Sequence, residues 1–337
     1  MNWWRRNILL TQVSESRSGA PAFVAGLALM ALGMMCAGQT RQAPAPIVEA
    51  GPEPVYKVNT RLVNVFVNAV DENGSPVGSL GKDDFQIFED KKPQTIAVYE
   101  KQSSTPLSVV MAIDTSGSMM KDARLVRDAA KQFVKDVIRQ QDEMQVVQFA
   151  QSVSVVVPFT NDPRKIEDGL RNLNEGQTTH MYDAIYQAGQ SLAARRLSVG
   201  TSGVRKRVIV LISDGGDSEM GRTFEEAEEE ALRGEAMVFS IIVVPIHADA
   251  GRNTGGEHAL IQMAADTGGK FYYTESPADL KTAFAHISDD LRTQYLLGYY
   301  APEHKPGTSL HSIVVQLADP AKRESDQLRY RSGYYGK

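Results

Sequence analysis

The central part of the chain alternates between short apolar runs and amphipathic stretches. We expect strands at 107–113, 144–150, 153–158, 207–213, 237–244 and 270–274. Helices are expected at 120–140, 163–172, 181–196, 223–233, 257–267 and 277–292. The runs RVIVLIS and MVFSIIVV are apolar without alternation, which is typical of strands covered on both faces. The pattern therefore predicts an α/β fold with a doubly wound, mostly parallel sheet, and one antiparallel edge strand after the short connection at Gln151-Ser152.

The segments on either side of this region are rich in β character. The stretch TRLVNVFVNAVDENG alternates and ends in a turn at Asp71–Gly74. Residues 83–100 predict two short strands joined by Asp90-Lys91-Lys92-Pro93. After residue 292 the stretches TQYLLGYYAP, LHSIVVQLAD and QLRYRSGYYG predict further strands, with no helical period. We expect the two flanks to pair into one small β domain; two separate β appendages are the alternative.

The N-terminal segment has the features of an export signal. Arg5 and Arg6 precede an apolar run at 20–37. Because this run of about eighteen residues reaches the lower limit for a spanning helix, an uncleaved anchor is the alternative. Lipidation of Cys36 is a less favoured third reading, because the residues before it match a lipidation site poorly. We therefore expect an exported protein, periplasmic, envelope-associated or secreted, that meets the membrane only through this segment.

These patterns together predict five segments. They are a signal peptide or N-terminal membrane anchor at 1–38, a Pro/Ala-rich linker at 39–54, the first half of the β domain at 55–104, the α/β domain at 105–292 and the second half of the β domain at 293–337.

Composition excludes several kinds of chemistry. The net charge is -5 and charged residues make up 23%, so there is no basic excess and nucleic acid is not an expected partner. The single cysteine, Cys36, lies in the N-terminal apolar run. The folded part therefore has no thiol for a disulfide, a zinc site or nucleophilic catalysis.

Oxygen-bearing side chains follow the predicted strands at one edge of the sheet. The motif Asp114-Thr115-Ser116-Gly117-Ser118 follows the first strand, Asp214 follows the fourth, and Thr179 precedes a helix. In an open parallel sheet the ligand crevice lies outside the carboxyl ends of the strands. Two carboxylates and three hydroxyls suit Mg²⁺ first, with Mn²⁺ or Ca²⁺ as alternatives. The predicted metal ligands are Asp114, Ser116, Ser118, Thr179 and Asp214.

These motifs, in this order, resemble the metal-ion-dependent adhesion site of von Willebrand factor type A domains, over about residues 106–292. The resemblance implies that the three hydroxyls contact the ion and that Asp114 and Asp214 bind it directly or through water. It also implies that an Asp or Glu carboxylate of a protein partner completes the coordination. The family often has Gly-Gly where Gln177-Thr178 stand, which leaves Thr178 as an alternative ligand. The β flanks are similar to a bacterial family of exported von Willebrand factor A-related proteins.

The expected function is therefore that of a non-enzymatic binding protein, without catalytic residues or an organic cofactor. One alternative is a scaffolding subunit of an envelope or ATPase-linked assembly that uses the same site. A serine hydrolase is another, since Ser118 and Lys121 match an S-x-x-K motif and Ser213-Asp214-Gly215 resembles S-D-N. Its third motif, at Lys281, falls in a predicted helix rather than a strand.

Two further alternatives concern single features. Ser116 and Ser118 could simply cap the helix that follows them. His247, Asp249 and His258 could bind zinc, although a polar loop is the ordinary explanation of such a stretch.

Overall fold

The computed structural model describes residues 61–101, 104–199, 204–218, 220–244, 253–302 and 309–336. The predicted export segment at 1–38 and the linker at 39–54 lie outside the described residues. Within the ranges just given, the helices are all too short or too polar to cross a membrane.

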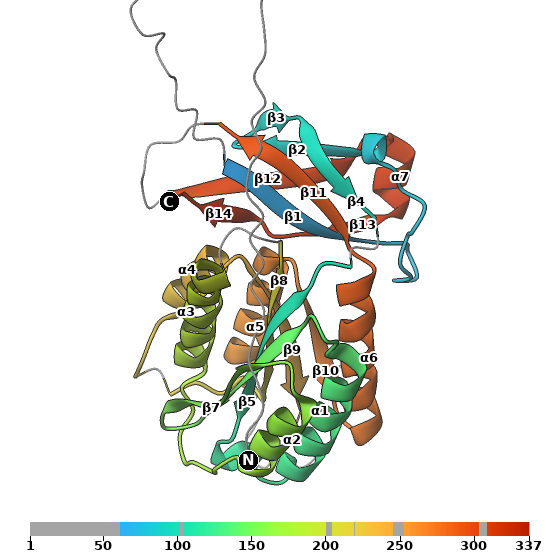
Figure 1. Ribbon diagram of the computed structural model, residues 1–337. Coiled ribbons are helices and arrows are strands. Elements are labelled where there is room, and N and C mark those ends of the chain that lie inside the picture. Colours follow the sequence, from blue (N-terminus) through green and yellow to red (C-terminus); the bar gives the residue numbers. More distant parts are fainter. Residues whose placement is uncertain are drawn as a thin grey trace, which may run out of the picture. The chain divides into compact units, whose positions relative to one another are not determined.

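A six-stranded sheet forms the centre of the α/β part (Figure 1). Its strands are β5 (Leu107–Asp114), β6 (Glu143–Phe149), β7 (Val153–Thr160), β8 (Lys206–Ser213), β9 (Ala236–Val243) and β10 (Lys270–Thr274). Their order is β10-β9-β8-β5-β6-β7, and neighbours are parallel except β6 and β7. The predicted fold class, including the antiparallel edge strand, is confirmed.

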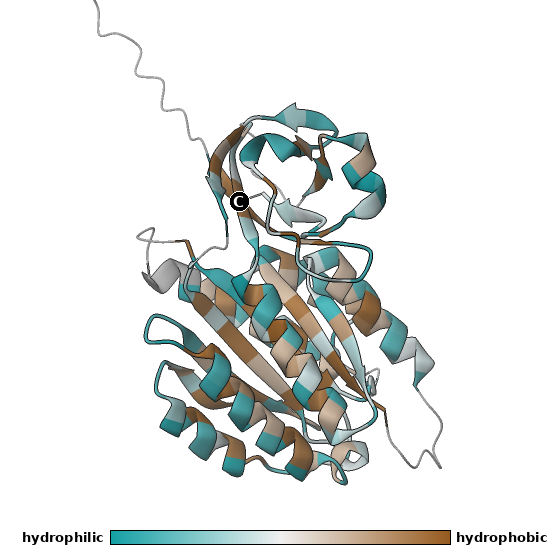
Figure 2. Ribbon diagram, turned by 90° about the vertical axis from the view of Figure 1, so that its right-hand side faces the viewer, coloured by the Kyte–Doolittle hydropathy of each residue, from teal (hydrophilic) through white to brown (hydrophobic). Residues whose placement is uncertain are grey.

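Three helices pack on each face of this sheet. One face carries α1 (Ala123–Val137), α2 (Pro163–Arg171) and α6 (Pro277–Arg292), and the other carries α3 (Met181–Val199), α4 (Phe224–Arg233) and α5 (Thr254–Thr267). Successive side chains of a strand point to opposite faces, so Val109 and Met111 pack on the first set and Val110 and Ala112 on the second. This two-sided burial explains the apolar strands, whose brown ribbons lie between helices with teal outer sides (Figure 2).

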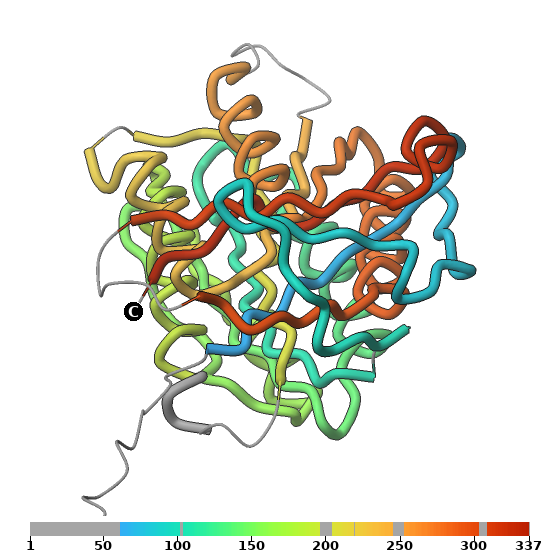
Figure 3. The backbone as a smooth tube through the Cα atoms, turned by 90° about the horizontal axis from the view of Figure 1, so that it is seen from above, coloured from blue at the N-terminus to red at the C-terminus, as the bar shows by residue number. Residues whose placement is uncertain are grey.

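Strands from both flanks pair with one another in the β part. One sheet has the order β13-β1-β11-β4 and the other β14-β12-β2-β3. The strands are β1 (Arg61–Val70), β2 (Phe85–Glu89), β3 (Lys92–Gln94), β4 (Ile96–Glu100), β11 (Tyr295–Ala301), β12 (Leu310–Leu317), β13 (Gln327–Arg329) and β14 (Gly333–Tyr335). Figure 3 shows the blue N-terminal strand running among the red C-terminal strands. A shared apolar core includes Val65, Ile87, Leu297 and Val315. The domain limits given above stay predictions.

Two local features differ from the sequence predictions. Asp90 and Lys91 alone form the turn after β2, both at positive φ (47° and 66°), and the next residues pair with β2 as β3. The expected connection to Pro93 was therefore too long, because a two-residue turn of this type matches the twist of the strands. A short helix, α7 (Pro320–Ser325), also lies where no helical period was expected. Asp319 caps it, accepting a bond from the Ala321 amide at 2.9 Å, and six residues are too few to show a period.

The β part is joined to the α/β part by a partly buried carboxylate. Glu235 lies in the turn between α4 and β9, at φ 51°. Its side chain, 13% exposed, lies 2.9 Å from the guanidinium of Arg61 and 3.6 Å from that of Arg331, and it also pairs with Arg207. Because Arg61 begins β1 and Arg331 precedes β14, one anion holds three separate segments of the chain together.

Candidate metal centre

The sheet has a point where its connections change direction. The chain continues from β5 to β6 on one side, whereas it continues from β8 to β9 on the other. β5 and β8 are parallel neighbours, so their carboxyl ends meet at one edge. Asp114 ends β5, and Asp214 follows Ser213 at the end of β8. This is the position at which open α/β sheets bind ligands.

Asp114 organises the loop after β5. Its side chain is buried, with the residue 3% exposed. Oδ1 accepts a hydrogen bond from the Ser116 amide at 2.9 Å, and Oδ2 accepts one from the Ser213 hydroxyl at 2.7 Å. The hydroxyl oxygens of Ser116 and Ser118 lie 3.1 Å apart. Because Ser116 is buried and Ser118 is exposed, this pair of hydroxyls leads from the buried carboxylate to solvent.

Thr179 and Asp214 are brought together beside Gly216. A Cβ atom on Gly216 would lie 3.1 Å from Oδ1 of Asp214 and 3.7 Å from the hydroxyl oxygen of Thr179. The backbone of Thr179 is held by Ser218, whose hydroxyl accepts from the Thr179 amide at 3.0 Å and whose amide donates to the Thr179 carbonyl at 2.8 Å. Thr179 is buried and Thr178 is exposed, so of the two adjacent threonines it is Thr179 that faces Asp214.

Backbone contacts close the site on two sides. The Gly176 amide donates to the Thr115 carbonyl at 3.0 Å, which holds the threonine loop against the loop after β5. On the other side Gly215, at φ 85°, lies against the first turn of α5. A Cβ atom on Gly256 would lie 1.7 Å from the Gly215 carbonyl oxygen. The loop that carries Asp214 is therefore in direct backbone contact with α5.

The electrostatics of the site favour a cation. Burial raises the pKa of Asp114 to about 6, and the nearby Asp214 carboxylate raises it as well. Hydrogen bonds from Ser116 and Ser213 oppose this shift. Two acids and three hydroxyls without an imidazole or thiol fit a hard divalent ion, which relieves the repulsion between the two carboxylates. The residues present therefore fit the group that the motifs imply.

Two supporting residues were not identified from the sequence. Ser213 donates to Asp114 and accepts the Gly215 amide at 3.1 Å, and Ser218 holds Thr179. The only sequence signal for Ser213 is a hydroxyl at the last position of an otherwise apolar strand. Asp217 accepts bonds from the first amides of α3, at Met181 (2.7 Å) and Tyr182 (3.3 Å).

The other hypotheses gain little from the geometry. Ser116 precedes a single 3-10 turn, but its side chain makes no capping hydrogen bond there. Lys281 lies exposed on α6, so the third hydrolase motif is on a helix. For the zinc hypothesis, His258 is exposed on α5, while His247 and Asp249 lie outside the described residues.

Comparison with solved structures gives distant similarities. The conserved hypothetical protein BatB from Bacteroides thetaiotaomicron is 20% identical, with a TM-score of 0.43, over 55% of this chain and 98% of that protein. Proximal thread matrix protein 1 from the mussel byssus, solved with zinc in its MIDAS motif, is 18% identical, with a TM-score of 0.45, over 57% of this chain and 49% of that protein. At these TM-scores the similarities say nothing of what this chain binds. Comparison with curated proteins gives no significant match.

A family model gives the more direct result. Residues 109–216, from β5 to the loop after β8, match the model of the von Willebrand factor type A domain. This stretch includes Asp114, Ser116, Ser118, Thr179 and Asp214. The match and the doubly wound sheet agree with the resemblance seen in the motifs. Residues 109–216 of this chain therefore belong to a von Willebrand factor type A domain.

Proposed function

We propose that this protein is an exported binding module that captures an acidic side chain of a protein partner through a divalent cation. The observation that carries the proposal is the oxygen-only site at the carboxyl ends of β5 and β8. Domains of this family generally serve metal-dependent protein interactions and are usually not enzymes. Export rests on the apolar segment at 20–37.

Each residue has a distinct part in this function. Ser116, Ser118 and Thr179 would hold the ion through their hydroxyls, and Asp114 and Asp214 would bind it directly or through water; Asp114 also fixes the hydroxyl loop. The bound ion supplies a site that attracts a carboxylate. An octahedral Mg²⁺ has one more coordination position than these five side chains fill, and a carboxylate of the partner would take it. Mg²⁺ is the proposed ion, since this oxygen set suits it.

A polar groove beside Thr179 gives a partner further contacts. Its lining includes His180, Asp183, Gln187, Met220 and Arg222. Met220 is 78% exposed, and the Arg222 guanidinium lies 4.3 Å from the ring of Tyr186. Groups of several kinds beside one ion site favour a folded protein or peptide over a small acid.

The test is a selection of random peptides displayed on phage against the full chain in Mg²⁺, with elution by chelator. We expect the selected peptides to contain Asp or Glu, and replacement of that residue by Asn or Gln to abolish binding. Thr179→Ala should abolish binding too, whereas Thr178→Ala, at the exposed neighbour, should leave it unchanged. Peptides that bind equally well in chelator, or to Thr179→Ala, would contradict the proposal.

The serine hydrolase alternative makes a different prediction. It requires covalent labelling of Ser118 by an acylating probe, and the loss of this labelling in Lys121→Ala. The binding module should show no such labelling. The scaffold alternative uses the same site on a partner within a complex, and co-purification of an assembly from the envelope would favour it.

A further inference from the structure

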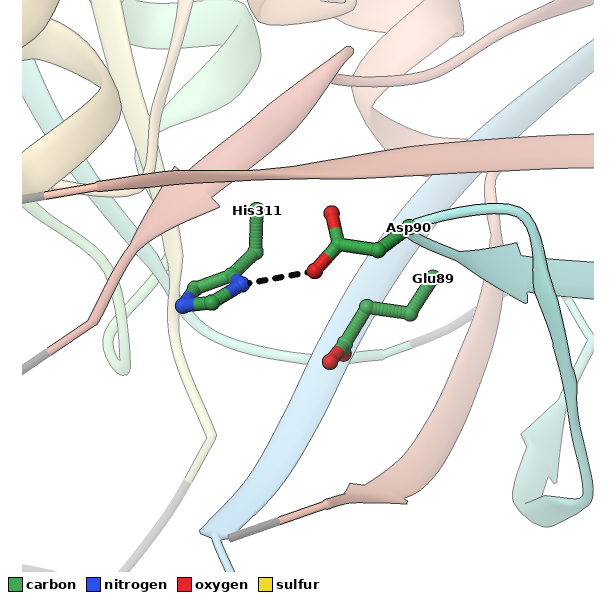
Figure 4. A group of neighbouring side chains, drawn as sticks. All are labelled: Glu89, Asp90 and His311. Atoms are coloured by element: carbon green, nitrogen blue, oxygen red, sulfur yellow. Dashed lines mark hydrogen bonds and ion pairs between the residues drawn. The ribbon is translucent and has the colours of Figure 1, made fainter. Parts of the chain in front are cut away.

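A second group of metal-ligating side chains lies in the β part. Glu89 ends β2, Asp90 follows it in the turn, and His311 lies on the neighbouring strand β12. One ligand atom from each lies within 4.8 Å of the others. Figure 4 shows the two carboxylates and the imidazole grouped together. We propose that these three residues form a binding site for a divalent transition metal, with Zn²⁺ as the first candidate.

Glu89 is held in place from both sheets. The residue is 1% exposed. Its Oε2 accepts hydrogen bonds from the hydroxyl of Tyr299 on β11 at 2.5 Å and from that of Tyr334 on β14 at 3.0 Å. These two bonds fix the orientation of the Glu89 carboxylate, and such outer partners are a regular feature of metal sites.

Asp90 is fixed equally well against β12. It exchanges backbone and side-chain bonds with Ser312: the Asp90 amide donates to the Ser312 carbonyl at 3.0 Å, and Oδ1 accepts from the Ser312 amide at 2.9 Å. Oδ2 lies 2.8 Å from Nδ1 of His311. The imidazole in turn packs on Tyr334, with ring centroids 5.4 Å apart. Both groups therefore keep their positions before any ion binds.

The donor set differs from that of the centre at Asp114. Two carboxylate oxygens and one imidazole nitrogen suit Zn²⁺ or Mn²⁺, and the nitrogen disfavours Mg²⁺ and Ca²⁺. The side chains of Asp90 and His311 are 42% and 13% exposed, so an ion and its water ligands can reach the site from solvent. An ion held there would link the turn after β2 to β12, and would stabilise the β part by binding only the folded state.

The test separates this site from the first centre. The full chain carrying Asp114→Ala is stripped with chelator and titrated with Zn²⁺ by calorimetry, and with Co²⁺ by visible absorption. We expect about one equivalent of each ion to bind. Adding His311→Asn or Asp90→Asn to this protein should weaken metal binding at least about tenfold. Loss of a residue that only orients a metal ligand usually has an effect of at least this size, so loss of a ligand should not have a smaller one. The matched control is His286→Asn, an exposed histidine on α6, which should bind as before.

Two results would overturn the proposal. One is an Asp114→Ala protein that binds neither ion. The other is binding whose affinity is unchanged by both His311→Asn and Asp90→Asn. Circular dichroism and the metal-free unfolding midpoint check that each variant folds. Asp90→Asn keeps an oxygen that can accept the Ser312 amide, so it decides the question if His311→Asn does not fold.

Discussion

The burial of Lys206 predicts how the free energy of unfolding depends on pH. Lys206 is the first residue of β8, it is 0% exposed, and its Nζ donates to the Leu291 carbonyl near the end of α6 at 2.6 Å. Burial, followed by the positive charge of Arg292, lowers the pKa of Lys206 from 10.5 to about 7, although Asp142 and Glu100 oppose the shift. In the unfolded chain Lys206 has its ordinary pKa of 10.5, so between pH 7 and pH 10.5 the unfolded state binds more protons than the folded state. Stability due to this residue therefore rises with pH across that window.

The size of the effect follows from the two pKa values. With 10.5 for the unfolded and about 7 for the folded state, the ionisable amine destabilises the fold by about 4 kcal/mol at pH 7 and about 2 kcal/mol at pH 9. Lys206→Met removes this cost but also the bond to Leu291, worth about 1 kcal/mol at either pH. The variant should exceed the wild type in free energy of unfolding by about 3 kcal/mol at pH 7 and about 1 kcal/mol at pH 9.

Urea unfolding followed by circular dichroism at pH 7, 8 and 9 measures this difference. Titration of the other groups is common to both proteins and cancels. Lys135→Met, at a half-exposed lysine on α1, is the control and should leave the pH dependence unchanged. A constant difference between Lys206→Met and the wild type over this range would refute the argument that Lys206 is buried with a lowered pKa.

Two further substitutions test, first, the ion pairs that join the β part to the α/β part and, second, the backbone contact beside Asp214. Glu235→Gln should lower the free energy of unfolding, measured by urea titration, by about 3 kcal/mol, because three guanidinium groups lose their shared anion. The control is Glu229→Gln, at a more exposed ion pair, which should change it by less than about 1 kcal/mol. Gly256→Ala should cost about 1–3 kcal/mol and weaken Mg²⁺ binding in calorimetry, because the added methyl group displaces the Gly215 carbonyl. The control is Gly255→Ala, whose added methyl group would lie 3.7 Å from its nearest neighbour and should change neither the stability nor Mg²⁺ binding. Equal effects of Gly255→Ala and Gly256→Ala would contradict the close contact between Gly256 and the Gly215 carbonyl.

The sequence predicts the α/β part well because strand and helix periods are strong there. β9 was expected at 237–244 and is observed at Ala236–Val243. The start of α1 was expected at residue 120 but lies at Ala123, because the loop after Asp114 continues through a 3-10 turn. α7 was missed, since a helix of six residues depends on its cap and a proline rather than on a hydrophobic period.

The sites differ in how far the sequence reveals them. The predicted ligands at the end of β5 and β8 belong to local motifs that follow apolar strands. The part played by Ser213 depends on how β8 lies against β5, which no local pattern records. The group at Glu89 is still less visible, because Asp90 and His311 are 221 positions apart and meet only when β2 pairs with β12.

The central claim, a cation held by the oxygens around Asp114, is tested most directly by thermal unfolding of the wild type and Asp114→Ala, first with chelator and then with Mg²⁺. Mg²⁺ is chosen because it prefers oxygen ligands and should not bind the group of Glu89, Asp90 and His311, which includes a nitrogen. At about 100 times its dissociation constant, a bound ion adds ~2.7 kcal/mol to the free energy of unfolding. We predict a raised midpoint in the wild type and none in Asp114→Ala. An unchanged midpoint in the wild type, or an equal rise in both proteins, would contradict the account.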